Sequence, residues 1–153
     1  MSIIIAEAYT LELKAWLKML VFYKKQLETL KQKLIQAIKV PILIRDMARL
    51  ETYQVNMISL EDFFFEIEEA IQQQLEQIDT KYLFDDVSKN QIIERQQLLI
   101  RHKLFFAEKK YLSFRFTLSQ YLISIFEVVI LARMSNHLPN LSSVGRRSTN
   151  IAI

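Results

Sequence analysis

The chain has 153 residues, of which 51% are hydrophobic, and a formal net charge of +3. It contains one Gly and two Pro, whereas average proteins have about 7% Gly and about 5% Pro, so turns must be scarce. It has no Cys, which excludes disulfides, thiolate nucleophiles and cysteine-ligated metals. A chain of this length can bury one core and requires no second domain.

The first predicted helix spans about residues 7–39. Its apolar residues recur at alternating steps of three and four, the spacing of the a and d positions of a heptad. They are Leu13, Trp16, Leu20, Tyr23, Leu27, Leu30, Leu34 and Ala37. Pro41 ends this helix, because it lacks an amide proton and disfavours helical geometry at Val40.

The second predicted helix spans about residues 42–79 and has a less regular pattern. Its apolar side comprises Met47, Leu50, Met57, Leu60, Phe64, Ile67, Ile71, Leu75 and Ile78. Ser59 followed by Asp62 fits a capping box, so this helix either continues or breaks near Ser59, which would give four helices. We favour a continuous helix, because Ser and Asn are common in the middle of helices.

Three consecutive aromatic residues, Phe63, Phe64 and Phe65, lie within the second helix. Neighbouring residues of a helix are about 100° apart, so three rings extend beyond one ordinary core stripe. Either at least one ring meets a second surface, or this helix is central to the bundle and widely buried.

The third predicted helix spans about residues 88–137 and begins at a cap formed by Ser88 with Gln91. Its a and d positions hold one heptad register for more than five repeats. They are Ile93, Gln97, Ile100, Leu104, Ala107, Tyr111, Phe114, Leu118, Tyr121, Ile125, Val128 and Ala132. Residues 138–153 form a polar tail that we expect to be flexible or ordered by a partner.

These patterns predict an all-α fold, an elongated antiparallel three-helix bundle with coiled-coil-like heptad packing over residues 1–137. Charge separates between the helices: the first has seven basic and three acidic residues, the second two and nine, and the third eight and three. Short connections make sequential helices antiparallel neighbours. We therefore expect the acidic second helix to pair with both basic ones.

The sequence carries no recognisable site chemistry, so we expect no enzyme and no catalytic, cofactor-binding or metal-binding residues. His102 and His137 lack the Glu-x-x-His pattern of helical di-iron sites, and two isolated His are too few ligands for zinc. Gly145 stands alone, whereas phosphate-binding loops need several Gly.

The helix lengths predict a mismatch. At 1.5 Å per residue the three helices span roughly 50, 55 and 75 Å, so about the last dozen residues of the third should project beyond the turn at Val40 and Pro41. The most apolar stretch of the chain lies there: Leu122, Ile123, Ile125, Phe126, Val128, Val129, Ile130 and Leu131. Such a patch is a liability for a monomer when it is exposed.

Three explanations for this stretch remain open. It can be a protein interface, with a second copy or another subunit; it can be covered by residues 3–5, by the second helix or through a kink; or residues 116–132 can contact a membrane, although Gln120 and Glu127 interrupt them. We favour the protein interface, and we predict its residues as follows: Leu122, Ile123, Phe126, Val129, Ile130, Phe63 and Phe65.

The sequence therefore favours a helical-bundle interaction protein, a structural or adaptor subunit of a larger assembly, with a protein partner or further copies of itself. A membrane-associated helical subunit is one alternative. A basic regulatory protein that binds nucleic acid through Lys14, Lys18, Lys25 and Lys39 is another and less favoured one. Residues 1–6 lack a basic stretch and a long apolar run, so we see no signal peptide and expect an intracellular, cytoplasmic protein.

Overall fold

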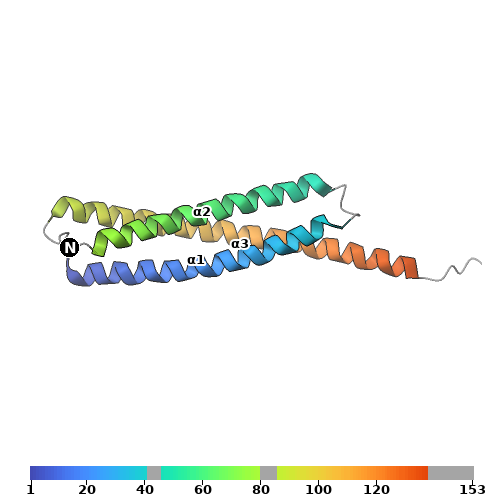
Figure 1. Ribbon diagram of the computed structural model, residues 1–153, viewed down its shortest axis with the longest axis horizontal. Helices are drawn as coiled ribbons and strands as arrows, with labels where there is room; N and C mark the ends of the chain where they lie inside the picture. Colours follow the sequence, from blue (N-terminus) through green and yellow to red (C-terminus); the bar gives the residue numbers. More distant parts are fainter. Residues whose placement is uncertain (41–45, 80–85, 138–153) are drawn as a thin grey trace, which may run out of the picture.

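A computed structural model describes residues 1–40, 46–79 and 86–137. These residues form three helices and no strand: α1 (Ile3–Ile38), α2 (Met47–Asp79) and α3 (Val87–His137). The three pack side by side, with α2 antiparallel to α1 and to α3 (Figure 1). The predicted elongated antiparallel three-helix bundle is confirmed.

Helix α1 begins at Ile3, earlier than the predicted start at residue 7. Ser2 is its N-cap, with an extended backbone and a side-chain oxygen that accepts a hydrogen bond from the Ile5 amide at 3.3 Å. A serine hydroxyl satisfies one of the amide groups that have no partner in the first turn of a helix. The sequence interpretation missed this cap.

Among the described residues, α2 begins at Met47; the predicted start at residue 42 falls within residues 41–45, which lie outside the described part. It continues without interruption to Asp79, so the alternative of a break near Ser59 is wrong. Met57, Leu60 and Phe64 are all buried on one side of this segment. The core contacts on both sides of Ser59 thus hold a single helix.

Helix α3 is capped by Asp86 and not by Ser88. One carboxylate oxygen of Asp86 accepts hydrogen bonds from the amides of Ser88 and Lys89, at 3.0 and 3.3 Å. A negative charge at this end of a helix also interacts favourably with the helix dipole. The predicted start was therefore one residue too late and its cap was wrong. The tail at residues 138–153 lies outside the described residues.

The core follows the predicted heptads closely. In α3 every predicted a and d residue from Ile93 to Ile125 is buried, and in α1 all are buried except Trp16, which is half-buried. Met47 and Val128 are exposed, because they lie at or beyond the ends of the neighbouring helices. Two buried residues of α2 were not predicted: Tyr53 and Gln74.

One aromatic ring from each helix meets in the middle of the core. Tyr23 of α1 lies 6.0 Å from Phe64 and 4.8 Å from Tyr111, between ring centroids, and Phe64 lies 6.1 Å from Tyr111. Phe64 is completely buried, Phe63 is half-buried against the Phe106 ring, and Phe65 is 56% exposed. Of the three consecutive rings, only Phe65 is left facing solvent.

Candidate functional site

Ion pairs between helices follow the predicted charge separation in part. Lys24 and Lys31 of α1 pair with Glu68 and Glu61 of α2, the second pair at 3.2 Å. Among the described residues, the ion pair that ties α3 to another helix goes to α1 rather than to the acidic α2. The Tyr121 hydroxyl of α3 donates to a carboxylate oxygen of Asp46, the residue just before α2, at 3.3 Å.

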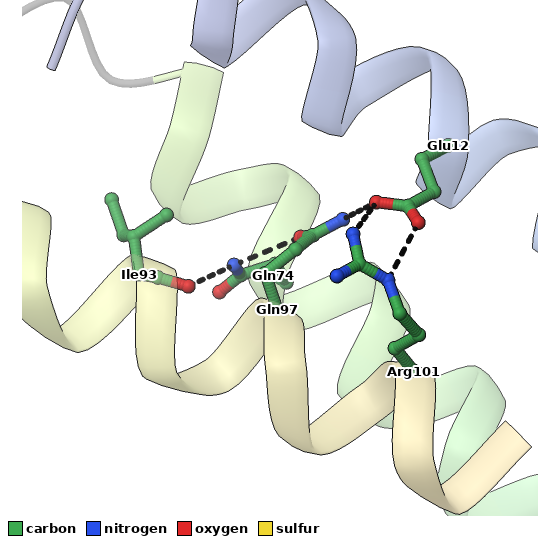
Figure 2. Close-up of polar contacts among 5 residues, drawn as sticks. All are labelled: Glu12, Gln74, Ile93, Gln97 and Arg101. Carbon is green, nitrogen blue, oxygen red and sulfur yellow. Dashed lines mark hydrogen bonds and ion pairs between the residues drawn. The ribbon is translucent and has the colours of Figure 1, made fainter.

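A layer of polar side chains crosses the bundle and joins all three helices (Figure 2). The Gln74 amide donates to the Ile93 carbonyl at 2.8 Å and to the Gln97 side-chain oxygen at 3.2 Å. The Gln97 amide in turn donates to Glu12 at 2.9 Å. Arg101 completes the layer with two hydrogen bonds to the same carboxylate, at 2.9 and 2.8 Å. We call Glu12, Gln74, Gln97 and Arg101 the polar layer.

The polar layer holds Glu12 as a hydrogen-bonded carboxylate. Burial raises the pKa of Glu12, but the hydrogen bonds from Arg101 and Gln97 outweigh it and lower the pKa below its usual value. A carboxylate held ionised by three donated hydrogen bonds is a poor proton acceptor. Polar residues at core positions fix the register between helices, which is the role that this arrangement supports.

A second polar contact, which is partly buried, joins α1 to α3. The Tyr23 hydroxyl donates to Glu108, and burial together with this hydrogen bond raises the pKa of Tyr23 to about 12. The phenol is therefore held neutral inside the aromatic core. Over the described residues, no three His, Cys, Asp or Glu side chains lie close enough together to hold a metal ion.

The end of α3 projects past the ends of α1 and α2 (Figure 1). Ile125 is the last buried residue of α3, and none of the twelve residues from Phe126 to His137 is buried. We call residues 126–137 the projecting end; it is about 18 Å long. Its exposed apolar side chains are Phe126, Val128, Ile130, Leu131 and Met134.

The predicted interface residues do not form one surface. Ile123, Phe126 and Ile130 are exposed and Val129 is half-buried, but Leu122 is 4% exposed and belongs to the core. Leu122 must be removed from the predicted interface. It is buried because α3 turns its side chain toward the other helices just before they end.

Phe63 and Phe65 are also separate from the projecting end. Phe63 packs against Phe106, which lies 20 residues before Phe126 on α3, or about 30 Å along the helix. A single small surface therefore cannot contain the Phe63–Phe65 region together with the projecting end.

Further apolar side chains on the outer side of α3 were not included in the predicted interface. Phe105 and Phe116 are each 68% exposed, and Leu112 is 50% exposed. The sequence could have revealed them, because Phe105 and Leu112 are apolar residues one heptad apart that do not belong to the a and d positions of the core. The exposed apolar surface is therefore longer than the projecting end.

The length and composition of α3 would allow it to cross a membrane, and among the described helices it is the one that meets this criterion. However, 28% of the residues in its most apolar window are buried inside the bundle. The rest of that window is not buried, but a single helix that meets a criterion of length and composition is weak evidence for a membrane span.

Comparisons with protein-family models, curated proteins and solved structures find no match for this chain.

Proposed function

We propose that this protein is a non-enzymatic, intracellular interaction protein, a helical-bundle subunit of a larger protein assembly that binds a partner through the projecting end of α3. The observation that supports this proposal is the exposure of five large apolar side chains on twelve residues that no neighbouring helix covers.

The energetics favour a partner at the projecting end. Leu131 and Met134 are 64% and 63% exposed, and Ile130 is 56% exposed. Covering an apolar side chain stabilises a complex by about 25 cal/mol for each Å² removed from water. A protein partner with an apolar groove would recover this energy, whereas a free monomer would expose a surface prone to aggregation.

The test compares two double substitutions of matched exposure and spacing. Val128→Asp with Leu131→Asp alters the projecting end, and Val55→Asp with Ile58→Asp alters an exposed part of α2; the four side chains are 48%, 64%, 64% and 54% exposed. Affinity capture with mass spectrometry should recover partners with the wild type and the α2 variant but not with the α3 variant. Equal recovery by all three chains would contradict the proposal.

Membrane association is the second candidate, and the apolarity of α3 supports it. Flotation with phospholipid vesicles tests it on the same three chains. Flotation of the wild type and the α2 variant, but not of the α3 variant, would favour lipid as the partner. A wild-type chain that stays at the bottom of the gradient favours a protein partner.

The nucleic acid alternative depends on the exposed Lys14, Lys18 and Lys25 of α1. Binding to phosphates weakens steeply with salt, because counterions are released. A filter-binding assay at low and moderate salt, with all three Lys changed to Gln as the control, measures this contribution. We expect no binding that these substitutions abolish.

A further inference from the structure

A second apolar stripe follows the outer side of α3. Its residues alternate by four and three positions, the spacing of a helix seam, and none is at the a or d positions that form the core. We call them the outer seam: Leu112, Phe116, Ser119, Ile123, Phe126 and Ile130. A residue step of about 100° places this stripe nearly opposite the core side of the helix.

The outer seam is open to solvent along its length. Its five large side chains are 43% to 68% exposed, and Ser119 is half-buried. Helix α3 therefore has two apolar stripes, one packed against α1 and α2 and one without a partner among the described residues. Charged residues limit the second stripe: Lys109 would be its next position before Leu112, and Arg133 would be its next position after Ile130.

From this arrangement we infer that the outer seam binds a second copy of the same chain, with the two α3 helices antiparallel. The inference deepens the proposed function by naming a partner for α3. It rests on that function, because Phe126 and Ile130 belong both to the projecting end and to the outer seam. Leu112 and Phe116 lie outside the projecting end, which allows the two surfaces to be tested separately.

Antiparallel pairing makes the seam complementary to itself. When Phe116 of one copy faces Phe126 of the other, Leu112 faces Ile130 and Ser119 faces Ile123. The small Ser119 thus meets a large side chain in its layer. Parallel pairing instead places Ser119 against Ser119, which leaves a layer with little apolar volume and a cavity.

Charge selects the same register. A shift by one heptad in one direction places Arg133 opposite Phe116, and a shift in the other direction places Lys109 opposite Phe126. A charged group facing an apolar layer without a partner is strongly unfavourable. The register with Phe116 opposite Phe126 keeps both cations out of the apolar layers. It places Lys109 of each copy opposite Arg133 of the other just beyond the seam, where these long side chains can extend into solvent.

The buried area is sufficient for a weak dimer. Half-exposed side chains of this size contribute on the order of 100 Å² each, so two copies of the seam bury about 1,000 Å². That area is at the lower limit of biological interfaces. Interfaces at this lower limit are typically weak and transient, so we expect reversible, concentration-dependent dimerisation.

Sedimentation velocity over a concentration series of the full chain tests the dimer. The mass should rise from one chain to two with concentration, and Phe116→Asp should weaken association at least about tenfold. Phe105→Asp is the matched control, because Phe105 is also 68% exposed but lies beyond Lys109, outside the seam. A wild type that remains a single chain at all concentrations, or equal weakening by both substitutions, would overturn the inference.

Cross-linking tests the orientation, and the absence of native Cys makes single-Cys variants unambiguous. Ser113, Gln120 and Glu127 are exposed and flank the same side of the seam at heptad intervals. In the antiparallel register, a short bis-maleimide should link Gln120→Cys to itself and Ser113→Cys only to Glu127→Cys. Self-linking of Ser113→Cys, or no link at Gln120→Cys, would refute the antiparallel pairing even if Phe116→Asp failed to fold.

The results also separate this inference from the proposed function. Phe116→Asp chains that are monomeric but still capture a partner through the projecting end support both. Dimers that capture no other protein support the outer seam and contradict a role in a larger assembly. Partner capture by a wild-type chain that never dimerises supports the proposed function and rejects the outer seam.

Discussion

Phe64 and Phe65 are adjacent on α2 but have opposite environments, so alanine substitutions at the two positions measure how much of the stability comes from the aromatic core. Phe64 is completely buried, with ring centroids of Tyr23 and Tyr111 at 6.0 and 6.1 Å. Phe65 is 56% exposed. The two substitutions remove the same atoms from the same helix.

The expected losses differ several-fold. Phe→Ala in a core lowers the free energy of unfolding by about 3–5 kcal/mol, more when the surroundings cannot close the cavity. The cavity left by Phe64→Ala would be lined by residues of three different helices, which cannot easily close it. We therefore expect a loss of about 4–5 kcal/mol in the free energy of unfolding. At Phe65 most of the ring already contacts water, and the higher helix propensity of Ala offsets part of the loss, so we expect about 0.5 kcal/mol or less.

Equilibrium urea unfolding measures both values, with helicity followed by circular dichroism and the surroundings of Trp16, the only Trp, by fluorescence. All chains should be at one low concentration, since self-association adds apparent stability. Phe64→Leu, expected to lose about 1.5 kcal/mol or less, provides a value if Phe64→Ala does not fold. Alanine variants that differ by less than about 1 kcal/mol would show that Phe64 is not a core residue of the folded chain.

Further predictions concern the polar contacts. The pKa of Glu12 is lowered in the fold, so its ionised carboxylate stabilises the folded chain at neutral pH. This stabilisation is lost as the pH falls through the folded-state pKa, so acid between about pH 5 and about pH 3 should destabilise the wild type more than Glu12→Gln. The pKa of Tyr23 is raised to about 12, so the neutral phenol stabilises the fold fully below about pH 10, and this stabilisation is lost as the pH rises through 12. An ultraviolet difference titration between wild type and Tyr23→Phe should show the raised pKa, and Glu108→Gln should lower that pKa. Replacing Gln74 and Gln97 together by Leu should leave the free energy of unfolding similar or higher but broaden the amide resonances in NMR spectra, because the register is less well specified; unchanged spectra would argue against that role.

Most of the architecture follows from the sequence alone. Apolar residues at steps of three and four, with one Gly and two Pro in the chain, specify long helices and the side of each that is buried. The helix lengths also predict that α3 outlasts its neighbours, since each residue adds a fixed rise. These properties are local, and a single helix already contains them.

Tertiary structure decided what depends on how the helices are placed against one another. The period of a helix does not give its rotation or its axial offset, so burial of Leu122 and the meeting of Gln74 with Ile93 could not be predicted. The caps at Ser2 and Asp86 depend on the backbone just outside each helix, where periodicity has no information. Identifying the outer seam required both the sequence and the tertiary structure. Its spacing is in the sequence, but only the packing shows that α1 and α2 leave it uncovered.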